Sequence, residues 1–224
     1  MRASRSLPIA ALAALSVALV AGPARAADDA VAVLTTGSPA GANVVVGDVL
    51  NAAVAAGTTA DFNTTSGGTT GIKCAASAFT ATVTDNPAAP GLATESATAH
   101  TFATCTANIL GVTKVTSVTV NNLPFGTTID SATGAVTVSG AAGAPVQTTL
   151  VLGTLLGSVT CVYQADGGAI TGVSSNTGNS IAFSNQAFSK SSGPITCPSA
   201  GFFTATYAPV LDTTVSGSPA VFVN

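Results

Sequence analysis

The chain has 224 residues, of which 47% are hydrophobic and only 7% are charged. Nine acidic residues outnumber six basic ones, and the formal net charge is −3. Duplex nucleic acid is held by several Lys or Arg contacts to phosphate, and anionic lipid by clusters of basic residues, so this composition argues against both kinds of partner.

The N-terminus predicts an export signal. Two arginines in MRASRS precede the apolar run LPIAALAALSVALVAG, and the run closes with PARA. Ala24 and Ala26 supply the small side chains that signal peptidase requires, so we expect cleavage before Ala27. The run is shorter than the roughly 20 apolar residues that usually span a bilayer. We therefore predict a secretory signal peptide at 1–26 and a secreted chain, 27–224, without a membrane anchor.

Removal of residues 1–26 would make the chain more acidic. All three arginines lie in that segment, whereas all nine acids follow it. The remaining cations are Lys73, Lys114 and Lys190, so three positive and nine negative charges give a formal charge of −6. This strengthens the prediction of no nucleic-acid partner.

Alternating apolar and polar residues predict strands along the rest of the chain. In AFTATVT, Phe79, Ala81 and Val83 alternate with threonines, and FTATY at 203–207 repeats the pattern. Segments rich in Val and Thr, which favour strands, occur at 43–49, 117–123, 134–140, 145–163, 180–188 and 220–224. The apolar residues of 47–57, GDVLNAAVAAG, could line a short helix, but the closely spaced glycines favour a strand.

Turn sequences separate these strands at short intervals. Gly, Pro, Asn and Asp in TGSPAG, TTSGG, DNPAAPG, ADGG and SSNTGNS supply the backbone angles that turns need. Many short strands without intervening helices are typical of an antiparallel sandwich. We predict an all-β, immunoglobulin-like β-sandwich, either as one unit over 27–224 or as two β halves with a boundary near 141–146, AAGAPV.

One local motif favours this fold class. In NLPFGTTIDSATGAVTVSG, which begins at Asn122, we expect Asp130 to cap the turn with its side chain and Gly134 to take the left-handed conformation. The segment resembles a signature of bacterial immunoglobulin-like and cadherin-like domains, Leu-Pro-x-Gly followed by Asp-x-x-Thr-Gly. Asn122 and Thr127 depart from that signature, which usually has a glycine and an apolar residue at these positions.

The mature chain also resembles a group of small secreted proteins from filamentous actinobacteria. The segments that carry the resemblance are LATESATAHTFATC from Leu92, SVTVNNLPFGTT, GSVTCVYQA, SGPITC and SPAVFVN. That group has no assigned activity, so the resemblance implies a source and an architecture but no mechanism.

Four cysteines in an exported chain are expected to form two disulfides. Of the three possible connectivities, we favour the local one, Cys74 with Cys105 and Cys161 with Cys197. A related phrase surrounds one cysteine of each pair, IKCAASAFTAT from residue 72 and ITCPSAGFFTAT from residue 195. We interpret it as structural, with a cysteine at a strand entry and a phenylalanine in the core behind it. A redox or metal site is disfavoured, because no Cys-x-x-Cys is present.

Few residues suggest catalysis. His100 is the only histidine and would have to act as the base of a serine-hydrolase triad, but no G-x-S-x-G is present, and we expect it to be partly exposed on a Thr-rich strand. Glycoside hydrolysis needs two carboxylates, yet Glu95 is the sole glutamate. Asp28 and Asp29 are interpreted as a solvated N-terminal segment rather than as calcium ligands. We predict no catalytic residue, no metal and no cofactor.

The leading hypothesis is a non-enzymatic extracellular protein of the cell envelope or medium, structural, adhesive or self-associating through exposed strand edges. The alternative is a binding module for a small molecule or glycan that holds an apolar ligand between its sheets. An uncharacterised secreted hydrolase is third. The side chains considered for the binding module, which more often form a core, are Phe79, Phe102, Phe125, Phe183 and Phe203.

Overall fold

The computed structural model describes residues 30–224, and these residues form sixteen strands. The predicted signal peptide, 1–26, lies outside the described residues, as do Asp28 and Asp29. The two short 3-10 helices are η1 (Ala141–Gly143) and η2 (Asp166–Gly168). In the described part of the chain, no helix is long and apolar enough to cross a bilayer. The strands are β1 (Leu34–Thr36), β2 (Ala42–Asn43), β3 (Val49–Ala53), β4 (Ala60–Asn63), β5 (Gly71–Asp85), β6 (Leu92–Ala107), β7 (Val112–Asn121), β8 (Phe125–Asp130), β9 (Ala135–Gly140), β10 (Gln147–Thr154), β11 (Gly157–Ala165), β12 (Ala169–Ser175), β13 (Ser180–Ser192), β14 (Ala200–Tyr207), β15 (Leu211–Asp212) and β16 (Val221–Val223).

Eight antiparallel strands close into a barrel, in the order β12-β9-β8-β6-β5-β4-β14-β13. The ring closes because β12 pairs with β9 along one edge and with β13 along the other. The all-β class is as predicted, but the sheet does not form a clear immunoglobulin-like sandwich. The difference arises because strand alternation defines a buried face without fixing which strands become neighbours.

Gly172 in β12 lies where the barrel closes and has no room for a side chain. It lies opposite Phe183 of β13 and Val136 of β9. A Cβ atom at this position would lie 2.9 Å from the Phe183 ring and 2.9 Å from the carbonyl oxygen of Ala182. Glycine therefore allows the phenylalanine ring to pack against the β12 backbone inside the barrel.

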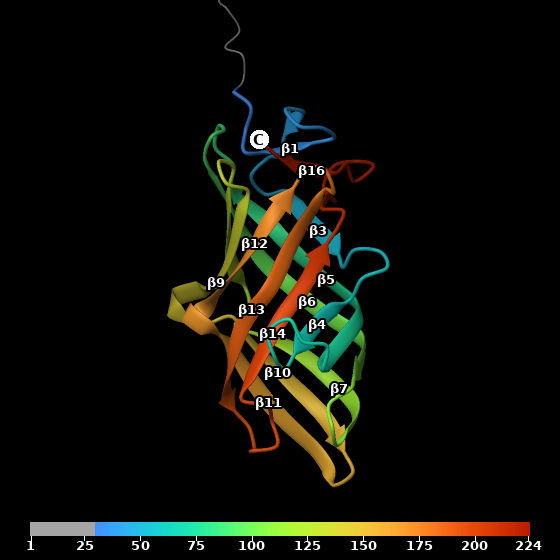
Figure 1. Ribbon diagram of the computed structural model, residues 1–224. Helices are drawn as coiled ribbons and strands as arrows, with labels where there is room; N and C mark the ends of the chain where they lie inside the picture. The colour runs from blue at the N-terminus through green and yellow to red at the C-terminus, as the bar shows by residue number, and fades with distance from the viewer. Residues whose placement is uncertain (1–29) are drawn as a thin grey trace, which may run out of the picture.

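Three further strands extend the sheet beyond the barrel. Residues 188–192 of β13 pair with β11. β11 pairs with β10, and β10 pairs with β7. In Figure 1 the β10–β11 hairpin lies at the end of the molecule opposite the C-terminus. The segment 141–146, predicted as a boundary, connects β9 to β10 and contains η1.

The disulfides join Cys74 to Cys105 and Cys161 to Cys197, which is the pairing that the sequence favoured. Cys74 and Cys105 face each other across β5 and β6. Cys161 belongs to β11, whereas Cys197 lies in the loop that precedes β14. The first bridge ties two neighbouring strands, and the second ties a loop to the extended part of the sheet.

Local turn chemistry follows the predicted motif between β8 and β9. Oδ1 of Asp130 accepts a hydrogen bond from the Ala132 amide at 2.9 Å, and Oδ2 accepts one from the Thr133 hydroxyl at 2.9 Å. Gly134 has a φ of +70°, the left-handed conformation expected for it. This turn brings β8 and β9 together as one wall of the barrel.

Several strand predictions are confirmed and one is largely wrong. Residues 47–57 contain β3, a strand rather than a helix, and 145–163 form the β10–β11 hairpin with a turn at Leu155 and Leu156. In the predicted strand 43–49, however, residues 44–48 form a turn. The Asp48 carboxylate caps that turn by accepting a hydrogen bond from the Val45 amide at 2.8 Å. Local side-chain bonding by aspartate thus outweighs the strand preference of the three valines.

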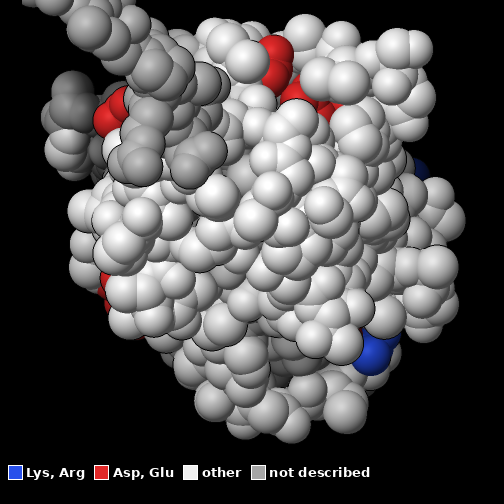
Figure 2. All heavy atoms as spheres, turned by 90° about the horizontal axis from the view of Figure 1, so that it is seen from above, with Lys and Arg blue, Asp and Glu red and all other residues white. Residues whose placement is uncertain are grey.

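The surface carries few charges. Figure 2 views the end with the C-terminus, where most of the described surface is white and only a few acidic side chains are visible. The charged residues of the described segment form one salt bridge, between Lys73 Nζ and Asp61 Oδ2 at 3.3 Å. Backbone ladders and small polar side chains therefore determine most of the surface chemistry.

Loss of the disulfide between β5 and β6 should destabilise the fold. The bridge closes a loop with a sequence separation of 31 residues, for which the chain-entropy model gives about 3 to 4 kcal/mol. We expect the double variant Cys74→Ala/Cys105→Ala to lose this amount of unfolding free energy in urea titrations. Ala75→Ser/Ala103→Ser, at exposed positions beside the bridge, is the control and should change little. A loss below about 1 kcal/mol would contradict the prediction.

Candidate functional site

A cluster of aromatic rings fills the middle of the barrel. The closest ring pair is His100 and Phe102, with centroids 4.5 Å apart, and both rings also approach Phe203, at 6.3 Å and 6.2 Å. Phe183 and Tyr207 complete one side of the cluster, with centroids 6.3 Å apart. The cluster consists of Phe62, Phe79, His100, Phe102, Phe183, Phe188, Phe203 and Tyr207.

A chain of hydrogen bonds crosses this aromatic cluster. The Tyr207 hydroxyl lies 2.6 Å from Nε2 of His100 and 2.8 Å from Oγ of Ser77. Burial raises the pKa of Tyr207 well above its ordinary value, against a smaller lowering by the Ser77 hydrogen bond. Burial also lowers the pKa of His100 to about 4. At neutral pH the chain therefore links a neutral imidazole to a neutral phenol.

A bulge in β6 places His100 inside the barrel. Thr80 of β5 pairs with Ala99 and the next residue, Ala81, pairs with Ala97, so Thr98 is an extra residue in β6. Residues five apart on a regular strand face opposite sides. Because the bulge adds one residue, Glu95 and His100 both face the interior.

Glu95 and His100 line one interior cavity. The space open to the centre of a water molecule is about 50 Å³, which is enough for more than one water molecule. Apart from Thr127, Tyr207 and these two residues, its walls are apolar. The lining consists of Phe79, Ala81, Glu95, Ala97, His100, Phe125, Thr127, Val136, Val138, Ile170, Ile181, Phe183 and Tyr207.

The Glu95 carboxyl is the unusual feature of this cavity. The side chain is only 8% exposed, and burial raises its pKa to about 7. Among the residues that the structure describes, no hydrogen bond or neighbouring charge contributes to this shift. Thr127 lies directly opposite Glu95 in β8 and also faces the cavity. A buried carboxyl without a partner is costly, so this one is available to a ligand.

Smaller voids continue the cavity in both directions along the barrel. A void of about 30 Å³ shares Glu95 and Val136 with it, and a void of about 20 Å³ shares His100. Phe62 lines this last void and the next one, also of about 20 Å³. Ile109, Leu152 and Pro198 line both that fourth void and an open groove of about 540 Å³ between β7, β10 and β11. A series of apolar spaces thus runs from this groove to Glu95.

The five phenylalanines singled out in the sequence all line these interior spaces. Phe79, Phe125 and Phe183 line the cavity that contains Glu95. Phe102 and Phe203 line the void of about 20 Å³ that shares His100 with this cavity. They lie inside a single closed barrel rather than between two sheets. Glu95, Ser77 and Tyr207 were not predicted as site residues.

The same geometry bears on the other predicted chemistries. His100 is partly exposed, as expected, but its ring lies in the aromatic cluster rather than on an outer face. Ser77 and His100 each bond to Tyr207, not to one another, so they do not form the serine–histidine pair of a hydrolase triad. Within residues 30–224, no group of three His, Cys, Asp or Glu side chains is placed to hold a metal ion.

The comparisons with known proteins give no further identification. Neither the models of known families, nor the curated proteins, nor the solved structures contain a match to this chain. The site is therefore interpreted from its own geometry.

The buried Glu95 carboxyl should leave a signature in the pH dependence of stability. Its pKa is raised from 4.5 to about 7 by folding, so the folded chain holds the proton more tightly, and this group's contribution to stability falls as the pH rises through that range. Glu95→Gln removes this effect. The unfolding free energy of the variant minus that of the wild type should increase by about 3 kcal/mol between pH 4 and pH 8.

Urea titrations at several pH values would measure this difference. His100 titrates in the opposite sense, but it is present in both proteins and its contribution cancels to first order. Thr127→Val changes the same cavity without removing a titratable group and is the matched control. Its unfolding free energy should differ from that of the wild type by the same amount at every pH. A difference for Glu95→Gln that decreases with pH would show instead that a cation stabilises the carboxylate.

Proposed function

We propose that this protein is an exported, non-enzymatic binding protein that holds an elongated apolar molecule, with one hydrogen-bonding end, inside its barrel. The observation that carries the proposal is the Glu95 carboxyl, which is 8% exposed, lines an apolar cavity and has no partner among the described residues. Sites for small molecules are commonly concave, mostly apolar and furnished with a few polar groups that orient the ligand.

The chemistry of Glu95 selects the polar end of the ligand. With a pKa of about 7, the carboxyl is partly ionised at neutral pH and can accept a hydrogen bond from a hydroxyl or pair with an ammonium group. A ligand carboxylate would meet a like charge in an apolar environment. We therefore favour long-chain alcohols or amines over fatty acids.

The shape of the interior selects the rest of the ligand. The voids follow one another, separated by side chains such as Phe62 and His100, and their walls are largely apolar. A linear hydrocarbon chain fits such a series better than a compact ring system, provided that the aromatic side chains change rotamer. The open groove beyond Leu152 supplies the route of entry.

Export and the absence of catalysis are part of the proposal. The predicted signal peptide and the two disulfides support an oxidising, extracytoplasmic location. The resemblance to small secreted actinobacterial proteins supports the same location. His100 and Tyr207 are assigned to the wall of the binding site.

A surface-contact role, the leading hypothesis from the sequence, is a second candidate. The barrel itself offers no strand edge among the described residues, since β12 and β13 pair with each other, but β7 at the end of the extension pairs with β10 on one side only. The specific observation in its favour is a set of exposed aliphatic side chains at the end of the molecule with the β10–β11 hairpin.

Calorimetric titration with decanol, decylamine and decanoate tests the proposed binding. We expect decanol and decylamine to bind and decanoate to bind at least about tenfold more weakly, a difference of about 1.4 kcal/mol. Ala97→Leu and Ala81→Leu add bulk at two paired positions of the cavity wall and should weaken binding of all three. Glu95→Gln should remove the preference for the amine over the carboxylate.

Ala103→Leu provides the matched control, because Ala103 lies on the same strand as Ala97 but is exposed. It should bind like the wild type. Circular dichroism would establish that each variant is folded. Failure of all three ligands to bind the wild type, or equal binding by folded Ala97→Leu and Ala81→Leu variants, would refute an interior site.

A further inference from the structure

Four aliphatic side chains project from the end of the molecule opposite the C-terminus. Leu110 is 101% exposed, Leu155 88%, Leu156 100% and Ile195 97%. They come from three loops, those between β6 and β7, between β10 and β11, and before β14. Figure 1 places these loops together at that end. We call this set of four side chains the apolar end.

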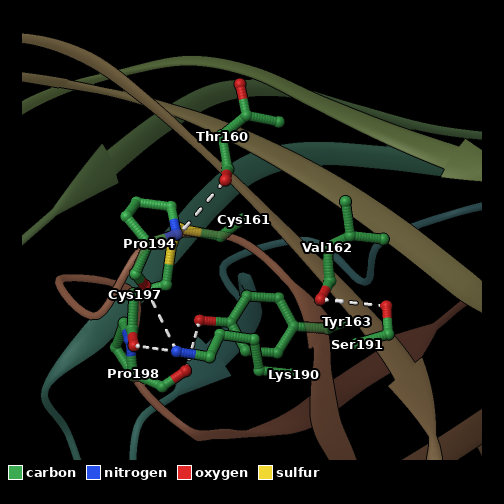
Figure 3. Close-up of a disulfide and its surroundings, with 9 residues drawn as sticks. All are labelled: Thr160, Cys161, Val162, Tyr163, Lys190, Ser191, Pro194, Cys197 and Pro198. Atoms are coloured by element: carbon green, nitrogen blue, oxygen red, sulfur yellow. Dashed lines mark hydrogen bonds between the residues drawn. A yellow bond between two sulfur atoms is a disulfide. The ribbon is translucent and has the colours of Figure 1, made fainter.

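The loop that carries Ile195 is held in place by several interactions (Figure 3). The Cys161–Cys197 disulfide ties it to β11, and the Lys190 ammonium donates hydrogen bonds to the carbonyl oxygens of Pro194 and Cys197, both at 3.2 Å. The Tyr163 hydroxyl donates to the Pro198 carbonyl at 2.9 Å. Ile195 is therefore exposed on a loop with fixed anchor points.

Gly193 lets this loop approach β11 closely. Its φ is +129°, and a Cβ there would lie 2.8 Å from the Thr160 carbonyl oxygen and 2.9 Å from the Cys197 sulfur. Any other residue would disturb the disulfide that supports the loop. The backbone of this loop is held in place, and yet Ile195 within it is exposed. An exposed aliphatic side chain on a fixed loop indicates a surface that contacts an apolar partner.

Charge is distributed in favour of an anionic partner at the apolar end. Lys190 lies in contact with the Ile195 loop, and Lys114 pairs in register with Gly153, just before the β10–β11 turn. Segments 108–116, 150–160 and 190–199 contain no acidic residue. Acidic side chains are visible at the opposite end of the molecule in Figure 2. Two of the three lysines, Lys114 and Lys190, thus lie near the projecting aliphatic side chains, whereas Lys73 forms a salt bridge with Asp61.

We propose that the apolar end docks on a phospholipid bilayer, with the four aliphatic side chains in the hydrocarbon boundary, the exposed Lys114 among anionic head groups, and Lys190 adding positive charge within the loop that it anchors. The sequence argued against anionic lipid from the small number of basic residues, whereas this proposal rests on where two of them lie. A second copy of the chain fits this surface less well, because an end-to-end dimer would bring the lysines of both copies together. The groove among the loops, about 540 Å³, would then open toward lipid.

Vesicle flotation tests the proposal with the whole folded chain. We expect binding to vesicles of equal parts phosphatidylcholine and phosphatidylglycerol, and weaker binding to phosphatidylcholine alone. Leu155→Ser/Leu156→Ser removes two of the four apolar contacts and should weaken binding to both vesicles by at least about tenfold. Lys114→Gln should weaken binding to the mixed vesicles by about fivefold, and binding to phosphatidylcholine alone should stay unchanged.

Val45→Ser/Val46→Ser is the matched control, because these valines are 64% and 58% exposed in the turn between β2 and β3, outside the apolar end. This variant should float like the wild type. Absence of wild-type binding to both vesicles, or unchanged binding of the leucine variant, would overturn the proposal. A dimer seen by light scattering and abolished by the leucine variant would identify a second copy as the partner instead.

Bilayer docking does not depend on the interior site. Ala97→Leu, which changes the cavity wall, should float like the wild type even where it binds no ligand. Loss of flotation in the leucine variant together with intact decanol binding would separate the two surfaces. Either proposal can therefore fail while the other stands.

Discussion

Closure of the barrel through β12 is the constraint on which the interior depends. Because β12 pairs with β9 and β13, the apolar faces of eight strands surround one space instead of covering a flat sheet. Aromatic rings from β4, β5, β6, β13 and β14 meet within that space. The low dielectric that results keeps the His100 imidazole neutral and the Glu95 carboxyl partly protonated.

Features governed by nearby residues were accessible from the sequence. The capped turn at Asp130 and the strand character of 47–57 follow from short-range chemistry. The cysteine pairing was accessible because four cysteines allow only three connectivities. The neighbour relations that close the barrel were not accessible, because they join strands far apart in the chain, such as β4 and β14, where Phe62 lies opposite Phe203, and this pairing leaves no local signal. An immunoglobulin-like turn motif therefore indicated a class of structure without indicating its closure.

The candidate site was hidden by a single extra residue. Strict alternation in LATESATAHTFATC puts Glu95 and His100 on opposite faces, and only the bulge at Thr98 brings both inward. The repeated Ile-x-Cys phrase has the expected structural role, since Cys74 and Cys197 lie at or just before strand entries and Phe79 and Phe203 face the interior, but its two isoleucines differ. Ile72 is 1% exposed within β5, whereas Ile195 is 97% exposed in a loop, so two similar sequence segments have isoleucines in opposite environments. The strand pairing of each segment, which its sequence does not specify, determines whether a residue lies in the core or on the surface.

The length of three strands has a consequence for cooperativity. β5, β6 and β13 contain 15, 16 and 13 residues, and β13 pairs with β12 and β14 in the barrel and with β11 in the extension. The barrel and the extension meet on β13, where the β11 ladder covers residues 188–192 and the β14 ladder reaches residue 189. Fraying of this end of β13 would therefore loosen both ladders at once, which couples local opening of the barrel to that of the extension.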